Sequence, residues 1–125
     1  MGPAQITEPV ILLNLRQLYR RGMSGIRLYD ITRGVWRLGK QRSRANFALA
    51  VAEGTIVEVY QIHQWHPAAT TPYLSGRRDQ SDPRYANRWE FTGAVAPAAV
   101  RNKYIGQSVK HYLTGAQNPI RYLNT

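Results

Sequence analysis

The clearest pattern in the chain is an alternation of large and small residues that begins near residue 45 and extends to residue 65. Large apolar residues alternate with alanines over 47–52, the Glu53-Gly54 pair interrupts the run, and β-branched and aromatic residues resume it over 56–62. Two such runs around a short polar break are typical of a β-hairpin. Neither arm has a purely polar face, so we expect both arms to be covered on both sides, as in a small barrel.

Weaker patterns on either side of the hairpin predict the remaining elements. Residues 9–15 are apolar and predict a strand, or a strand that runs into a short helix. Ser24 and Gly34 are residue types that begin and end helices, and the apolar spacing between them predicts one. The other expected elements are a short strand over 35–38, a connecting loop over 39–46, a strand over 88–95, helices over 97–104 and 108–115, and a last strand over 119–123.

A long segment without apolar period, residues 66–87, separates the hairpin from the strand that follows it. It is rich in Pro, Gly, Ser, Asp and Thr, and loops of about twenty residues inside a domain are usually functional or mobile. The element list as a whole predicts one α+β domain over residues 1–125. We expect a small, mixed or antiparallel, partly open β-barrel with two or three short flanking helices.

The charge of the chain indicates a function in addition to a fold. The chain of 125 residues carries 17 Lys and Arg against 7 Asp and Glu, a formal charge of +10 and an isoelectric point near 10.5. Arginine supplies 14 of the 17, and nine basic residues lie within 16–44, where the only acid is Asp30. Such a local excess predicts a surface for a polyanion, because arginine binds phosphate through two parallel hydrogen bonds. The alternative is a solvated basic face with no specific partner.

The composition also limits the kinds of site and the cellular location that we expect. The chain has no cysteine, which excludes disulfides and thiolate metal sites. No apolar run approaches the ~20 residues of a membrane helix, so we expect a soluble, cytoplasmic protein without a membrane partner. No Gly-rich phosphate loop, nucleophile elbow or zinc-protease motif is present.

Two sets of residues are of types that can bind a metal or take part in catalysis. Glu58 and Glu90 lie on expected strands, where they would either share a cation or, more simply, each pair with an arginine such as Arg88. His63 and His66 have a spacing that suits a metal on a helix, but a strand directs the two rings to opposite sides. We therefore expect no metal, no cofactor and no catalytic residue.

The three tryptophans each stand beside basic or polar residues: Trp36 before Arg37, Trp65 between Gln64 and His66, and Trp89 after Arg88. Tryptophan next to arginine is typical of proteins that stack and clamp a base that has left its helix. The alternative is that two of the three are ordinary core tryptophans whose N–H groups find backbone partners.

The order of elements resembles small PUA-like barrels, which include the ASCH, EVE and YTH modules. The shared features are a strand, a helix, an Arg-Gly-x-Trp entry at 33–36, a buried hairpin, a long loop and a final Arg-Trp-Glu-Phe strand at 88–91. The resemblance spans most of the chain as a pattern of elements. It implies a compact barrel with a basic cleft and an aromatic pocket that accepts a nucleotide, often a modified one.

Together these observations predict a non-catalytic domain that binds DNA or RNA. The residues expected to contact the nucleic acid are Arg33, Trp36, Arg37, Lys40, Arg42, Arg44, Trp65, Arg88, Trp89, Lys110 and Arg121. Two alternatives stay open: a small nuclease or hydrolase that acts on nucleic acid, and a basic protein-interaction subunit of a phage or mobile-element assembly.

Overall fold

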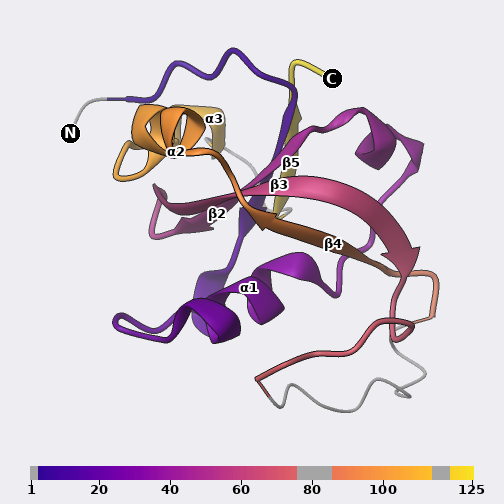
Figure 1. The fold of residues 1–125 in the computed structure, drawn as a ribbon. Coiled ribbons are helices and arrows are strands. Elements are labelled where there is room, and N and C mark those ends of the chain that lie inside the picture. Colours follow the sequence, from indigo (N-terminus) through magenta and orange to yellow (C-terminus); the bar gives the residue numbers. More distant parts are fainter. Residues whose placement is uncertain (1–2, 76–85, 114–118) are drawn as a thin grey trace.

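In the computed structural model, which describes residues 3–75, 86–113 and 119–125, five strands form one mixed sheet. The strands are β1 (Val10–Asn14), β2 (Phe47–Ala52), β3 (Thr55–Pro67), β4 (Trp89–Val95) and β5 (Ile120–Leu123). Their order is β4-β3-β2-β1-β5, with β1 and β2 parallel and the other pairs antiparallel (Figure 1). Within the described ranges the edge strands β4 and β5 do not pair with each other, so the sheet is not closed into a barrel.

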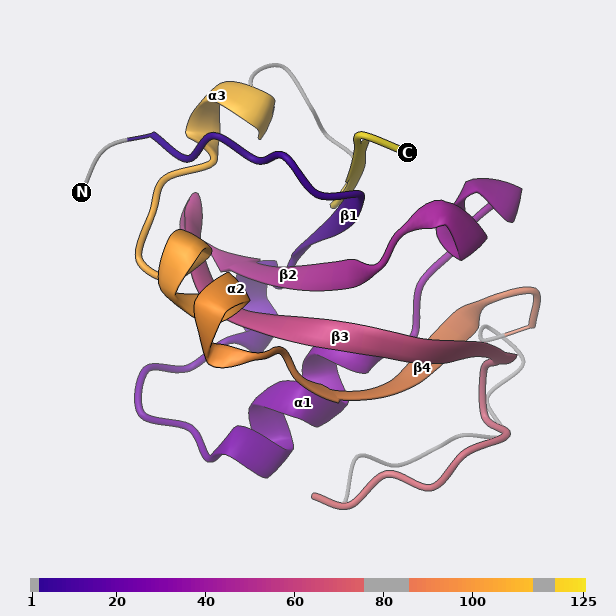
Figure 2. The same cartoon turned by 45° about the horizontal axis from the view of Figure 1, so that its top comes forward.

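Helices cover both faces of this sheet. They are α1 (Gly25–Arg33), α2 (Ala98–Tyr104) and α3 (Lys110–Leu113), with two short 3-10 helices, η1 (Arg16–Leu18) and η2 (Lys40–Arg44). The helix α1 lies on one face, and α2 and α3 lie on the other (Figures 1 and 2). In the part of the chain that the structure describes, no helix is long and apolar enough to cross a membrane.

The predicted elements agree with this fold in most places. The α+β class, the mixed sheet, the hairpin and the strand that returns to it are confirmed. The Ser24 side chain accepts a hydrogen bond from the backbone N–H of Arg27 at 3.2 Å and so caps α1 as expected. The predicted helix end at Gly115 and residues 76–85 of the predicted loop lie outside the described residues.

Three boundaries differ from the expectation. The strand expected over 35–38 is reduced to one isolated bridge, in which Trp36 and Trp89 exchange both backbone hydrogen bonds, at 2.9 and 2.7 Å. The connecting loop expected over 39–46 contains η2. The strand β3 continues to Pro67, because its polar end pairs with β4 even though it lacks an apolar pattern.

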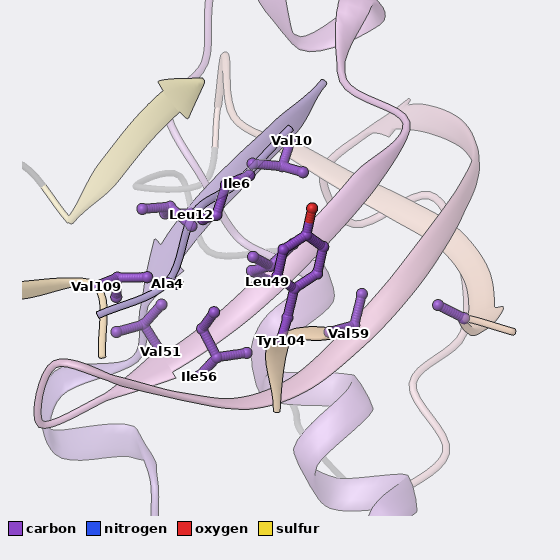
Figure 3. Close-up of a cluster of buried hydrophobic side chains, with 11 residues drawn as sticks. Ala4, Ile6, Val10, Leu12, Leu49, Val51, Ile56, Val59, Tyr104 and Val109 are labelled. Atoms are coloured by element: carbon purple, nitrogen blue, oxygen red, sulfur yellow. The ribbon is translucent and has the colours of Figure 1, made fainter. Parts of the chain in front are cut away.

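Two hydrophobic cores lie on opposite faces of the sheet. The aliphatic core is formed by Ala4, Ile6, Val10, Leu12, Leu49, Val51, Ile56, Val59, Ala96, Tyr104 and Val109 (Figure 3). The N-terminal segment, α2 and α3 lie over this face of the sheet (Figures 1 and 2). The aromatic core is formed by Ile11, Leu13, Leu15, Ile31, Trp36, Ala45, Ala48, Ala50, Tyr60 and Phe91, with Tyr29, Trp65 and Tyr122 packed against it. Successive residues of β1 alternate between the two cores, as a strand covered on both faces requires.

The alanines of β2 explain why the second core is aromatic. Ala48 and Ala50 are fully buried, and Ala48 lies directly opposite Tyr60 on β3. The short alanine side chains leave space for large rings on this face. The Tyr60 ring packs 5.4 Å from the Tyr29 ring and 6.2 Å from the Phe91 ring, between centroids, which are favourable separations for tilted aromatic pairs.

Candidate functional site

The 3-10 helix η2 is held at the end of the sheet where β3 ends and β4 begins (Figure 2). Its five residues are all polar, so it has no apolar stripe of its own and depends on contacts with the sheet. The guanidinium carbon of Arg42 lies 3.4 Å from the centroid of the Trp89 ring, a close cation–π contact. The indole N–H of Trp65 donates to the Arg42 carbonyl at 3.0 Å. These two contacts fasten η2 to both strands.

Five of the predicted basic residues gather around this point, and we call them the basic surface: Arg37, Lys40, Arg42, Arg44 and Arg88. Arg37 and Arg88 line the same hollow, of about 320 Å³, and Arg88 directly precedes Trp89, on which Arg42 stacks. Arg37, Lys40 and Arg44 are exposed, and Arg42 and Arg88 are half-buried. Within the described part of the chain none of the five forms an ion pair.

The carboxylates at the surface lie elsewhere in the fold. Glu58 forms two hydrogen bonds with the Arg101 guanidinium on α2, at 2.8 and 3.0 Å. Glu8 pairs with Lys103 at 3.0 Å, and Glu53 lies in the turn between β2 and β3. Among the described residues, Arg101 and Lys103 of α2 are therefore paired with carboxylates, whereas the five cations around η2 are not.

The remaining described carboxylates are buried. Glu90 on β4 is 0% exposed and accepts hydrogen bonds from the backbone N–H groups of Ala69 and Thr71 at 2.9 and 2.8 Å, from the Thr71 hydroxyl and from the Tyr73 hydroxyl at 2.9 Å. Burial by itself would raise the pKa of Glu90, but these hydrogen bonds outweigh it and leave the pKa below its ordinary value. Asp30, also 0% exposed, accepts from the backbone N–H of Ser75 at 2.6 Å. Together they tie residues 69–75 to β4 and α1.

Glu58 and Glu90, the two candidates for a shared cation site, are not neighbours. Glu58 lies opposite β2, whereas Glu90 lies opposite His66 on β3, so they do not face each other across paired strands. An arginine partner is confirmed for Glu58, where it is Arg101, but is wrong for Glu90. The ring of His66 contacts the Thr92 hydroxyl at 3.0 Å. Among the described residues there is no group of three or more His, Asp or Glu side chains that could hold a metal ion.

Arg33 does not belong to the basic surface, although the sequence places it there. Its side chain is 2% exposed, donates from Nη2 to the Thr71 hydroxyl, and lies over the Tyr73 ring at 4.2 Å. A phosphate needs an accessible guanidinium, so the burial of Arg33 argues against this predicted contact. The sequence gives no sign of the burial, because Thr71 is 38 residues further along the chain.

The three tryptophans separate into different environments. Trp36 is 7% exposed, belongs to the aromatic core and donates its indole N–H to the Thr32 carbonyl at 2.7 Å. Trp65 also has a backbone partner, the Arg42 carbonyl, but it is only half-buried. Trp89 is half-buried with Arg42 over its ring. Trp36 therefore fits the alternative of a core tryptophan, and Trp65 and Trp89 border the basic surface.

Two predicted basic residues lie apart from the others. Lys110 is exposed on α3, and its side chain packs beside Gly54 in the β2–β3 turn, at the opposite end of β3 from η2. Arg121 is exposed on β5, between Ile120 and Tyr122, which pack against the aromatic core. Because side chains alternate along a strand, Arg121 projects to the other face of the sheet.

A hollow of about 410 Å³ opens between η2 and β3, and we call it the η2–β3 hollow. It is lined by Arg42, Ser43, Ala45, Asn46, Ile62, His63, Gln64 and Trp65. Asn46 was not predicted as a site residue from the sequence, and His63 was considered only because of its spacing to His66. No local signal in the sequence marks Asn46, because its place beside Trp65 depends on the pairing of its backbone with Ile62 on β3.

Comparison of the sequence with protein-family models and with curated proteins, and of the fold with solved structures, finds no match. What the chain does is therefore inferred from its own charges, burial and contacts.

Proposed function

We propose that this protein is a non-catalytic nucleic-acid-binding domain that contacts phosphates through the basic surface. One observation carries the proposal: five basic side chains gather around η2, while the Asp and Glu side chains of the described residues are buried or lie elsewhere. Unpaired positive charge concentrated on one surface attracts a polyanion, and guanidinium groups suit phosphate oxygens in geometry as well as in charge.

The resemblance to PUA-like barrels belongs to the same proposal. A sheet with helices on both faces is compatible with a partly open barrel of that kind, although its edge strands stay apart in the described residues. The position of Trp65 and Trp89 beside the basic surface supports a nucleotide, modified or not, held against an aromatic side chain.

Salt-dependent binding tests the proposal. Fluorescence anisotropy with single- and double-stranded DNA and RNA oligomers is titrated across salt, for the wild-type protein and for the variant Arg37→Gln/Lys40→Gln/Arg44→Gln. These three side chains are exposed, so the fold should tolerate their replacement. Each phosphate contact contributes roughly 0.7–0.9 to the slope of log K against log salt. Loss of three contacts should therefore weaken binding and flatten the slope by about 2–3.

The matched control is Arg21→Gln/Arg27→Gln/Lys110→Gln, which removes the same net charge from exposed positions away from η2. We expect it to bind much more tightly than the first variant, with a slope near that of the wild type. An equal loss in both variants would show that net charge alone matters and would overturn the basic surface as the interface. Absence of binding to every oligomer at low salt would overturn the function itself.

A further inference from the structure

We propose that the η2–β3 hollow takes one unpaired base of a single-stranded nucleic acid, whose phosphates lie on the adjoining basic surface. This inference rests on the proposed function and adds two statements to it: which strandedness the protein prefers, and where the base is held.

The hollow presents polar side chains that have no partner in the fold. Asn46, His63 and Gln64 are exposed, and within the described ranges their side chains form no hydrogen bond. Two amides and an imidazole supply both hydrogen-bond donors and acceptors. The edge of a base also carries donors and acceptors, so the two can pair. A hollow lined in this way can recognise a base by its edge.

A β-bulge interrupts β3 where two of these residues line the hollow. The register between β3 and β4 shifts between Ile62 and Gln64, which leaves His63 without a partner on β4. In a regular strand His63 and Gln64 would point to opposite faces, but both line the hollow. Bulges are common beside functional sites, and this one lies in the wall of the hollow, between two residues that line it.

The aromatic wall of the hollow is held in place before any ligand arrives. Trp65 is fixed by the hydrogen bond from its indole N–H to the Arg42 carbonyl and by an edge-to-face contact with Phe91, with centroids 5.3 Å apart. A wall that is already ordered loses little conformational freedom on binding. The other tryptophans are less suited to this role, since Trp36 is 7% exposed and the Trp89 ring carries Arg42.

The size and position of the hollow favour an unpaired base over a duplex. Its volume of about 410 Å³ falls in the range of small-molecule sites, roughly 300–1,000 Å³. A base in a duplex is stacked and paired, so it enters such a site only after leaving the helix, whereas a base in a single strand is already free to enter. Arg42 and Ser43 belong to both η2 and the hollow, so a strand whose phosphates contact η2 passes directly over it.

The experiment compares three probes on the full chain: a single-stranded oligomer, the same oligomer with one abasic nucleotide moved stepwise along it, and the matching duplex. For the wild type we expect the single strand to bind tighter than the duplex. We also expect an abasic nucleotide to weaken binding about tenfold when it occupies the position of the held base.

The variant is Asn46→Ala/His63→Ala/Gln64→Ala, and the control is Gln5→Ala/Asn102→Ala, which removes exposed polar side chains away from the hollow. In the hollow variant the preference for single strands and the abasic penalty should both decrease, because only stacking on Trp65 remains, while the salt slope stays. The control should keep all three. A hollow variant whose abasic penalty equals that of the wild type, or a wild type that prefers the duplex, overturns this inference but leaves the proposed function standing. Failure of the proposed function differs, because no probe then binds at low salt.

Discussion

The two faces of the sheet are built from different side chains. On one face, large aliphatic side chains of β1 and β2 pack beneath α2, α3 and the N-terminal segment. On the other, alanines of β2 lie beneath a cluster of aromatic rings. The two faces therefore differ in what they support. The aliphatic face needs only to exclude water, whereas the aromatic face extends to the tryptophans that anchor η2.

The cations of α2 and those around η2 also differ. On the α2 side, Arg101 and Lys103 are paired with carboxylates, and the pKa of each of these cations is raised, first by the hydrogen bond to its carboxylate partner. Around η2 the basic side chains have no such partners among the described residues. The comparison teaches that total charge does not show where unpaired positive charge lies, because cations that are already paired with carboxylates contribute little field beyond their own surroundings.

The largest expected effect comes from removing a large side chain on the aliphatic face. Leu49 is 0% exposed at the centre of β2, so Leu49→Ala should lower the free energy of unfolding by about 2–5 kcal/mol, through lost burial and the cavity left behind. Urea denaturation measures the loss, and Ile26→Ala at an exposed position of α1 is the control. Nucleic-acid affinity per folded molecule should not change. A large loss of affinity would mean that the two faces are not independent.

The second effect tests the buried polar cluster on the other face. Glu90→Gln keeps the size of the side chain but replaces one acceptor oxygen by an NH₂ group that faces existing donors. We expect a loss of about 1–3 kcal/mol, measured by urea denaturation, because buried donors are left unsatisfied. Glu53→Gln in the exposed β2–β3 turn is the matched control and should stay within about 0.5 kcal/mol of the wild type.

The same variant has a pH signature of definite sign. The pKa of Glu90 in the fold is lower than its ordinary value of 4.5, so its carboxylate stabilises the folded protein at pH values above that ordinary pKa. This contribution is lost as the pH falls through the lowered pKa. The stability gap between wild type and Glu90→Gln should therefore narrow in acid. A gap that stays constant or widens below pH 4.5 would contradict the ionised state of Glu90.

Several elements could be predicted from the sequence because their signals are local. The hairpin follows from the alternation over 47–62, and the start of α1 follows from Ser24, which caps it through a residue three positions away. The end of β3 could not be predicted in this way. Its residues are polar and pair with β4, so the apolar alternation disappears where the strand continues.

The site was harder to predict than the fold because burial depends on distant partners. Nothing near Arg33 shows that Thr71 and Tyr73 cover it, and nothing near Trp36 distinguishes a core ring from a stacking surface. The grouping of Arg37 with Arg88 likewise depends on the bridge between Trp36, which precedes Arg37, and Trp89, which follows Arg88. Local charge predicted that a basic surface exists, but only the tertiary fold determines which of the charges share it.

The smallest expected effect separates paired from unpaired cations directly. Arg101→Gln and Arg44→Gln each remove one positive charge, but Arg101 is already paired with Glu58 through two hydrogen bonds and its side chain is 38% exposed. The pair should contribute about 0.2–1 kcal/mol to stability, measured as the coupling between Arg101→Gln and Glu58→Gln in a double-mutant cycle. Arg101→Gln should leave the affinity for a single-stranded oligomer nearly unchanged, whereas Arg44→Gln should weaken it at every salt concentration and reduce the salt slope by roughly 0.7. If the two substitutions weaken binding equally, the position of a positive charge does not matter, and the distinction between the two sides of the sheet has no functional meaning.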